Sequence, residues 1–157
     1  MSDKLSHISN GNARMVDVSE KSITLREAVA RGEVHFPADV WKHLQEENFH
    51  TPKGAIVETA RIAGIMAAKQ TGQLIPLCHP LPITFCDVTF ETADQKMVIT
   101  ATARIQAGTG VEMEALTAVS VAALTVYDMT KALSHDIAIE HVRLIRKTGG
   151  KKDVHNG

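Results

Sequence analysis

The sequence has few of the features that stabilise secreted proteins or hold proteins in membranes. Among its 157 residues only Cys78 and Cys86 are cysteines, and the first residues show no apolar signal segment. We therefore expect a reducing, cytoplasmic setting and no disulfide scaffold. No apolar run approaches the ~18 residues that a membrane-spanning helix needs. Disulfide-rich secreted proteins and membrane-spanning proteins are thus excluded.

An excess of charge of one sign is also missing. Seventeen Lys and Arg residues against eighteen Asp and Glu residues give a net charge of −1. A nucleic-acid-binding domain is usually strongly basic, so we expect no nucleic-acid partner. With 44% hydrophobic and 22% charged residues, the composition is that of an ordinary soluble protein, and the length suits one domain with its own core.

Aromatic residues are scarce as well, with four phenylalanines, one tyrosine and one tryptophan. The core must therefore consist mainly of small aliphatic residues, which suit helices that lie close to a sheet or to each other. One stretch, residues 115–127 (ALTAVSVAALTVY), carries no charge at all. A helix that is apolar on every side is buried on every side. We favour a second copy of the chain as its cover, in a closed symmetric oligomer; the alternative cover is the chain's own N-terminal segment.

The order of local patterns predicts an α+β fold. We expect a flexible arm over 1–14, a single catalytic domain over 15–152 and a C-terminal tail over 153–157. Within the domain we predict strands over 15–19 and 22–36, helices over 37–48 and 51–70, a proline-fixed loop over 74–82, a hairpin of strands over 83–92 and 96–107, a helix over 109–133 and a strand over 136–147. Residues 22–36 could also form a helix, but the β-branched residues at the ends and Gly32 favour a bent strand. This order indicates a ferredoxin-like antiparallel sheet with the helices packed on one face.

Three local signals set the boundaries of these elements. In 96–107 apolar residues alternate with mostly polar ones, which is typical of a strand with one buried face. Pro37 and the pair Thr51-Pro52 suit helix starts, with Thr51 as the N-cap. Thr109 and Glu112 have the Thr-x-x-Glu spacing of a capping box, which predicts a third helix start.

Charged residues return at both ends of the apolar helix, with Glu112 and Glu114 before it and Asp128 and Lys131 after it. Asp128 and Lys131 share a helix face, so they can form a simple helix-end ion pair. Their apolar surroundings favour a functional role instead, because charges beside a buried face are costly. Glu114 and Asp128 would be ~21 Å apart along the helix, so a site that uses both would draw them from different subunits.

His79 lies in the loop that three prolines fix, and a histidine on rigid backbone suits acid–base or hydrogen-bonding work. Together with Cys78 and Cys86 it offers a conceivable metal site. The spacing of the cysteines matches no zinc motif, however, and the sequence shows no evident fourth ligand. We therefore predict no metal ligands and regard both cysteines as small buried hydrophobic residues.

Two further segments suit an anionic ligand. Lys53 follows Thr51-Pro52 at a predicted helix start, where a cation is unfavourable unless an anion is bound beside it. Residues 147–152 (KTGGKK) could close over phosphates or could be a solvated basic end. Residues 108–110 (GTG) lack the Gly-Lys-Ser/Thr ending of a phosphate-binding P-loop, so we exclude a nucleoside triphosphatase of that type.

Several longer motifs, in this order and spacing, resemble those of the molybdenum cofactor biosynthesis protein C (MoaC) family. The resemblance runs from about residue 5 to residue 152. It is carried by 15–19 (MVDVS), 59–65 (TARIAGI), 74–81 (LIPLCHPL), 110–116 (GVEMEAL), 127–129 (YDM) and 147–151 (KTGGK).

The resemblance implies a ferredoxin-like subunit in a homohexamer, a trimer of dimers. It also implies a lyase that converts cyclised dihydro-GTP, made upstream by a radical-SAM GTP cyclase, into cyclic pyranopterin monophosphate and diphosphate. The resemblance assigns catalytic roles to Asp128, Lys131 and Lys53, and substrate contacts to Leu77, Cys78, His79, Met113 and Glu114, with Glu112 beside them. From the residue chemistry we add His79 as a further catalytic acid–base group, and Lys147 and Lys151 as cations that contact the phosphates. We expect no cofactor, and any Mg²⁺ would come with the triphosphate.

Two rival functions belong to other classes. A regulatory domain of the same fold would bind the nucleotide and return it unchanged, because fold alone does not decide function. A metal-dependent phosphohydrolase would lose its activity on chelation of the metal. Both are less consistent with the motifs than a synthase is.

Overall fold

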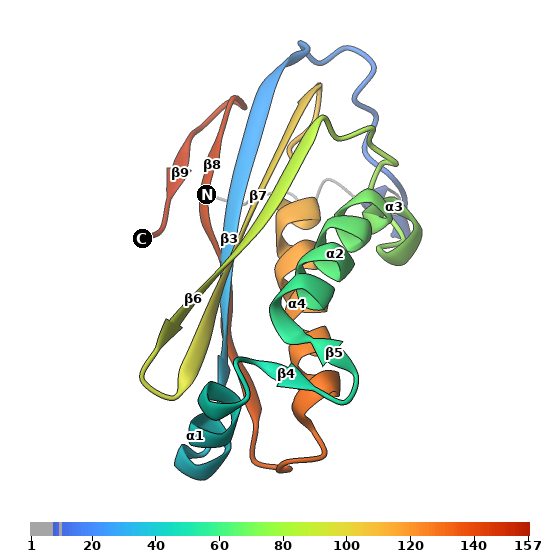
Figure 1. Cartoon of the computed structure of the whole chain (residues 1–157). Helices are drawn as coiled ribbons and strands as arrows, with labels where there is room; N and C mark the ends of the chain where they lie inside the picture. The colour runs from blue at the N-terminus through green and yellow to red at the C-terminus, as the bar shows by residue number, and fades with distance from the viewer. Residues whose placement is uncertain (1–7, 10) are drawn as a thin grey trace.

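The computed structural model describes residues 8–9 and 11–157, and Figure 1 shows an elongated sheet with two long helices beside it. The main elements are β3 (Thr24–His35), α2 (Ile56–Lys69), β6 (Phe85–Ala93), β7 (Lys96–Ala107), α4 (Glu112–Thr130) and β8 (Ala138–Thr148). The smaller ones are β1 (Ile8–Ser9), β2 (Asn12–Ala13), α1 (Ala38–Glu46), β4 (His50–Thr51), β5 (Gly54–Ala55), α3 (Thr71–Leu74) and β9 (Val154–His155).

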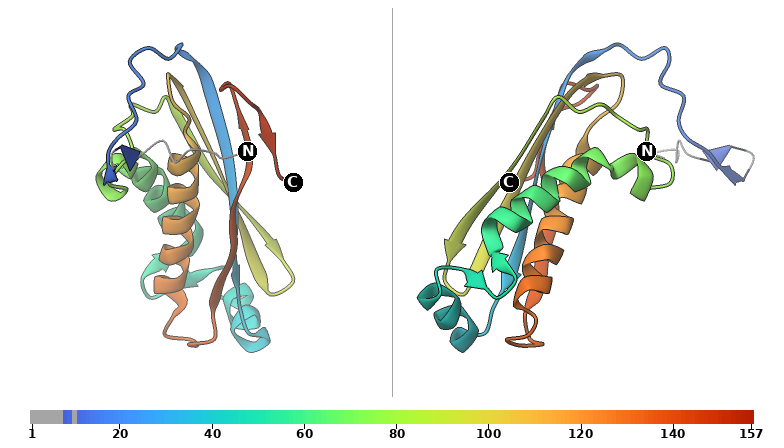
Figure 2. Two further views of the ribbon diagram at one scale, coloured as in Figure 1. Left: turned by 180° about the vertical axis from the view of Figure 1, so that it is seen from behind. Right: turned by 45° about the vertical axis from the view of Figure 1, so that its right-hand side comes forward.

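The main sheet confirms the predicted α+β class. Its strand order is β6-β7-β3-β8-β9, and every neighbouring pair is antiparallel. Along the chain, the sequence β3–α2–β6–β7–α4–β8 is the β-α-β-β-α-β order expected from the sequence. The predicted hairpin forms between β6 and β7. Both long helices lie on the same face of the sheet, as the two views of Figure 2 show.

The core lies between this face and the two helices. The alternation predicted for β7 is confirmed, because Met97, Ile99, Ala101 and Ala103 are fully buried while Thr100 on the other face is not. The small core residues let α2 and α4 approach each other closely. At Gly64 of α2 an added Cβ would lie 2.9 Å from the carbonyl oxygen of Ala118 in α4. A bulkier residue there would force the helices apart.

The strand predicted over 15–19 does not form. Residues 14–18 are irregular, and the backbone carbonyls there bind partners other than a neighbouring strand. The carbonyl of Val16 accepts a hydrogen bond from the His79 ring at 2.7 Å, and that of Val18 accepts the Lys21 N–H at 3.0 Å. The alternation of MVDVS places Val16 and Val18 at a cavity rather than in a sheet.

Two of the predicted helix starts were also wrong. Thr51 is in β4 of a small β4–β5 hairpin, where its hydroxyl accepts the Lys53 N–H, and α2 begins at Ile56. Gly54 has φ = +117°, which is incompatible with a helix at this point. The Thr109–Glu112 capping box is absent: the residue before α4 is Val111, which makes no side-chain cap. Pro37 directly precedes α1 rather than starting it.

The C-terminal segment turns back on the sheet. Val154–His155 form β9 against Arg146 and Lys147 of β8, a strand that the sequence pattern did not predict. Gly149 permits the turn because its φ is +92° and an added Cβ would clash with the Leu25 carbonyl oxygen. At the other terminus, the predicted arm over 1–14 lies partly outside the described residues; within them, β1 pairs with β2.

Among the residues that the structure describes, none of the helices is both long and apolar enough to cross a membrane.

Candidate functional site

The predicted site residues fall into two groups at opposite ends of α4. This helix is continuous over 19 residues. Glu112, Met113 and Glu114 occupy its first turn, and Asp128 is close to its end. The helix thus fixes the distance between the two groups, and each group takes its other members from different parts of the chain.

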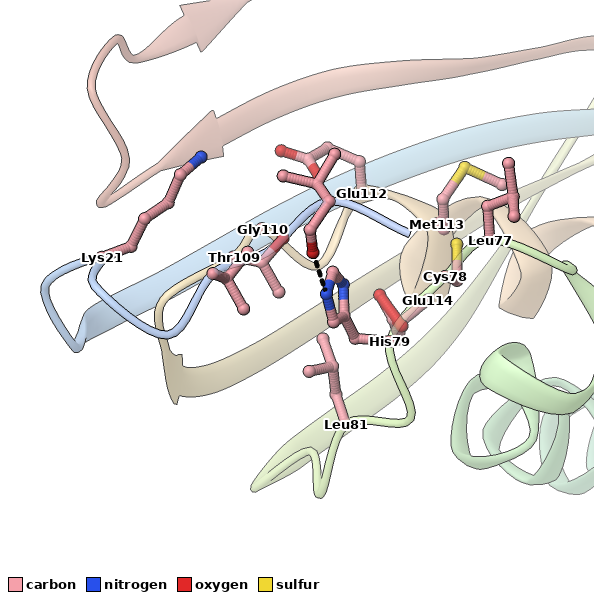
Figure 3. A pocket seen from close by; sticks show the side chains of 12 residues that line it. Lys21, Leu77, Cys78, His79, Leu81, Thr109, Gly110, Glu112, Met113 and Glu114 are labelled. Carbon is pink, nitrogen blue, oxygen red and sulfur yellow. Dashed lines mark hydrogen bonds between the residues drawn. The ribbon is translucent and has the colours of Figure 1, made fainter. Parts of the chain in front are cut away.

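The first group surrounds a cavity of about 250 Å³ (Figure 3). It is lined by Val16, Val18, Lys21, Leu77, Cys78, His79, Leu81, Thr109, Gly110, Glu112, Met113 and Glu114. These side chains come from three segments: the irregular 16–21 stretch, the proline-rich loop and the start of α4. All six residues predicted from the 77–79 and 112–114 motifs are therefore brought to one cavity.

His79 is held at this cavity by the 15–19 segment. Its Nε2 lies 2.7 Å from the carbonyl oxygen of Val16, as the dashed line in Figure 3 marks. A carbonyl can only accept a hydrogen bond, so Nε2 must carry a hydrogen. This leaves Nδ1 as the ring nitrogen that can meet a ligand, as an acceptor in the neutral ring or a donor in the cation.

Glu114 is a buried carboxyl group beside the same cavity. Only 3% of the residue is exposed, and this burial raises its pKa to about 7, with a smaller contribution from the negative charge of Glu112. A carboxyl with such a pKa can both donate and accept a proton near neutral pH. Burial also raises the pKa of Cys78, again with Glu114 and Glu112 adding to the effect, so its thiol stays protonated.

The two cysteines differ in their surroundings. Cys86 lies on β6, packs against the core and has its pKa raised to about 11 by burial, as expected of a small buried hydrophobic residue. Cys78, which is partly buried as Cys86 is, lines the cavity instead. The expectation that both are merely buried hydrophobic residues therefore holds for Cys86, whereas Cys78 is placed to touch a ligand.

An ion pair holds Glu112, one of the residues that line the cavity. Lys147 Nζ at the end of β8 lies 3.0 Å from Glu112 Oε1. Glu112 is the first residue of α4, so it is not in the capping position predicted for it. Lys151 lies in a neighbouring hollow of about 420 Å³ with Arg26, and Lys21 lines both spaces. Four cationic side chains thus lie around the rim beyond Glu112, which suits an anionic ligand.

Lys21 and Arg26 were not predicted as site residues. Each stands in a mixed polar segment with no motif of its own. Arg26 reaches the rim because β3 pairs with β8, which brings it next to the Gly149–Gly150 turn. Lys21 precedes β3 and lies beside Gly108. Arg26 Nε donates to the Thr24 hydroxyl, which in turn donates to the Gly149 carbonyl at 2.5 Å.

The second group consists of three charged residues, two lysines that both contact one aspartate. Lys53 Nζ lies 3.1 Å from Asp128 Oδ2 and donates to the Asp128 carbonyl at 3.0 Å, while Lys131 Nζ lies 3.2 Å from Asp128 Oδ1. The hydrogen bonds from Lys53 and then Lys131 hold the pKa of Asp128 below its usual range. The carboxylate therefore stays charged and orients two ammonium groups. About half of each side chain is exposed.

The two groups do not meet within one chain. Between Glu114 and Asp128 the helix advances ~21 Å, and both groups are fixed to it. The structure confirms the continuous helix on which this distance was based. Each group is accessible from outside the chain, so each can contact a ligand that lies between two copies.

Known proteins resemble this chain over nearly its whole length. The model of the MoaC family matches residues 15–150. A cyclic pyranopterin monophosphate synthase of Xanthomonas campestris pv. campestris is 52% identical over 98% of this chain and 94% of its own. Synthases of the same name from Roseiflexus castenholzii and a Nostoc species are 55% and 53% identical, over 96% of this chain and 96% and 90% of their own lengths.

Proposed function

The chain belongs to the MoaC family, and from this we propose that it is a cyclic pyranopterin monophosphate synthase of molybdenum cofactor biosynthesis. In finer detail, we propose a cytoplasmic phosphorus–oxygen lyase that converts cyclised dihydro-GTP, supplied by a radical-SAM GTP cyclase, into cyclic pyranopterin monophosphate and diphosphate. The observation that carries the proposal is the cavity at the start of α4, where two motifs far apart in the sequence meet.

The cavity suits the two ends of such a substrate. A guanine-derived ring offers N–H donors, and Glu112 and Glu114 supply carboxyl oxygens in the first turn of α4. The triphosphate needs positive charge, which Lys21, Lys147 and Lys151 supply around the rim. His79 Nδ1 can then exchange a proton with a group bound between these two regions.

The proposed reaction needs several proton transfers and no redox change. The purine ring is opened by water and reclosed as a pyranopterin. A sugar hydroxyl attacks the α-phosphorus, a new P–O bond forms as the bond to the β-phosphate breaks, and diphosphate leaves. A base takes the hydroxyl proton, and cations offset the charge on the leaving group. We propose no resident cofactor, and Mg²⁺ would enter with the triphosphate.

Lys53 and Lys131 are the groups that we assign to proton transfer at the ring, with Asp128 as the carboxylate that positions them. The pair of ammonium groups on one carboxylate supports this assignment, because each lysine then has a fixed direction rather than a mobile side chain. A fixed donor or acceptor contributes more to catalysis than a mobile one.

We propose that the complete site forms between two copies in a homohexamer, a trimer of dimers. Besides the ~21 Å between the groups, an apolar surface supports this. Ile62 and Met66 of α2 and Leu124 of α4 are more than half exposed, on the two long helices that cover one face of the sheet. A second copy that covers these residues would bury the side of α4 that its own chain leaves open.

The test is incubation of the purified protein with cyclised dihydro-GTP, with diphosphate release and the pterin product both measured. A synthase yields diphosphate and product in equal amounts. A regulatory domain would bind the nucleotide and return it unchanged, which would overturn the proposal. A metal-dependent phosphohydrolase would instead release phosphate or diphosphate without the pterin product and would lose activity with a chelator.

A further inference from the structure

Two histidines and two glutamates gather on the face of the sheet that lies opposite α2 and α4. His35 Nε2 lies 3.3 Å from Glu140 Oε2 and 3.5 Å from Glu33 Oε1. His141 Nε2 lies 3.8 Å from the same oxygen of Glu140. Within residues 8–9 and 11–157, Glu33, His35 and His141 form the one group of three or more potential ligands whose ligand atoms lie within 4.8 Å of one another.

A bulge in β8 creates this cluster. Arg31 pairs with Arg143 and Glu33 pairs with Glu140, so two residues of β8, His141 and Val142, lie opposite the single residue Gly32. His141 has φ = +56°, a left-handed conformation that is rare for residues other than glycine and occurs often at functional sites. Such a bulge changes the direction of a side chain.

The bulge sends its two side chains to opposite faces. An added Cβ on Gly32 would lie 2.7 Å from Val119 of α4 and 3.0 Å from Val142, so Val142 lies on the helix side of the sheet. His141 lies on the other face, beside His35 and Glu33. Without the extra residue, the alternation of β8 could not place both His141 and Glu140 at this cluster.

The cluster leaves a ligand nitrogen without a partner. His35 Nε2 is buried and has no hydrogen-bond partner, because its contacts with the two glutamates, at 3.3 and 3.5 Å, do not have hydrogen-bond geometry. An unpartnered buried nitrogen is unfavourable. Lys96 donates a hydrogen bond of 2.7 Å to Glu33 Oε1, which leaves the second carboxylate oxygen of Glu33 available.

We propose that His35, His141, Glu33 and Glu140 bind one divalent transition metal ion of the zinc type. Imidazole nitrogens with carboxylate oxygens are a ligand set for such ions, whereas Mg²⁺ and Ca²⁺ take oxygen ligands. Ligand atoms at ~2.0–2.1 Å from a tetrahedral Zn²⁺ are roughly 3.3 Å apart. The two separations to Glu140, 3.3 and 3.8 Å, are close to this value. The 3.5 Å contact of His35 is with Glu33 Oε1, which Lys96 holds, so Glu33 must turn its second oxygen toward the ion. Glu140 lies outside the group whose ligand atoms are all within 4.8 Å of one another, so its side chain must move as well.

Positive side chains near the cluster oppose a cation and limit its affinity. Lys96 contacts Glu33, and Arg31 and Arg143 line the same hollow of about 460 Å³. Arg143 is partly occupied elsewhere, because it donates to the Asn156 carbonyl at 3.1 Å. The ion would join β3 to β8 across the bulge. It would therefore stabilise the sheet, on the face opposite the helices and away from the α4 cavity.

The experiment uses the full-length protein in its native assembly, freed of metal with a chelator and then dialysed. Zn²⁺ is titrated against a chromogenic competitor, and Co²⁺ serves as a spectroscopic probe of tetrahedral coordination. We expect one ion per protomer. His35→Gln and His141→Gln should each lower the affinity at least ~10-fold. The control His43→Gln, on the exposed side of α1, should bind Zn²⁺ like the wild type.

A second readout does not depend on enzymatic activity. Zn²⁺ should raise the Tm of the wild type and of His43→Gln, but not that of His35→Gln or His141→Gln. If His141→Gln fails to fold, Glu140→Gln replaces it as an exposed ligand variant and should show the same loss. Unchanged Zn²⁺ affinity in the cluster variants, or no saturable binding by the wild type, would overturn the proposal.

Discussion

Glu114 and Asp128 lie on the same helix, α4, one buried beside the cavity and the other exposed between two lysines. The helix keeps them ~21 Å apart along its axis. Because α4 is continuous, it keeps the cavity residues and the Asp128 group apart within one chain. Two copies of the chain can nevertheless bring the cavity of one close to the Asp128 group of the other. In a dimer with a two-fold axis, the start of one α4 can approach the end of the other.

Mixing two inactive variants tests this arrangement. Glu114→Gln and Asp128→Asn should each be almost inactive alone. After subunit exchange at equal amounts, half of the interfaces contain one chain of each kind, and half of the sites in those interfaces have both native residues. About a quarter of the wild-type activity should therefore return. No recovery after exchange has been verified by mass spectrometry would contradict a site shared between two copies.

Lys53→Ala and Lys131→Ala should separate catalysis from stability. Both lysines are about half exposed and pair with Asp128 at the surface, where an ion pair contributes at most ~1 kcal/mol. The variants should keep their Tm and their substrate affinity, but turnover should fall at least ~100-fold. Single-turnover kinetics and thermal melting measure the two effects.

Lys42→Ala is the matched control for these lysine variants. It removes an exposed lysine that pairs with Glu46 at 4.0 Å on α1, and it should leave turnover unchanged. Asp128→Asn should behave like the lysine variants. If it only lowers the Tm and leaves turnover intact, the Asp128–Lys131 contact is a structural ion pair at a helix end.

The sequence predicts best those features that depend on neighbouring residues. The alternation over 96–107 matches β7 residue by residue, because a strand with one buried face imposes its own period on the side chains. The apolar stretch over 115–127 lies within α4, because a helix that is packed on several sides has few positions for charged residues. Six of the twelve residues that line the α4 cavity were predicted from the 77–79 and 112–114 motifs, and the structure brings them together.

Features that depend on distant partners were not predictable. Glu112 does not form the predicted capping box because α4 begins at Glu112 itself, after Val111, and its carboxylate pairs with Lys147 from the other end of the domain. Thr51 does not start α2 because it belongs to a hairpin whose turn leads into Gly54. The bulge at His141 exists only through the register of β8 with β3, which no local pattern reveals.

Gly64→Ala should destabilise the protein although alanine is the better helix former. In an exposed helix this change would stabilise by ~1 kcal/mol. Here the new Cβ would lie 2.9 Å from the backbone oxygen of Ala118, which cannot rotate away. We expect a net loss of ~1–3 kcal/mol in the free energy of unfolding. Denaturant unfolding measures it, and a gain in stability would show that α2 and α4 can separate without cost.

Glu114 should make the stability of the protein fall as pH rises. Its pKa is about 7 in the folded protein, against 4.5 for an ordinary glutamate, because burial disfavours the charged form. Between these two values the folded protein binds more protons than the unfolded chain. Stability therefore decreases as pH rises through this window and levels off above about pH 7. The total effect is about 3 kcal/mol.

Glu114→Gln removes the titrating group while keeping the size of the side chain. The variant should gain stability over the wild type at pH 8 and little or none at pH 4.5, because the wild-type carboxyl is already neutral there. Tm values across this range, at one protein concentration, give the comparison. Glu46→Gln, an exposed glutamate on α1, is the control and should parallel the wild type. If the stability difference between Glu114→Gln and wild type is the same at both pH values, Glu114 is already charged in the folded protein at pH 4.5, and burial does not raise its pKa.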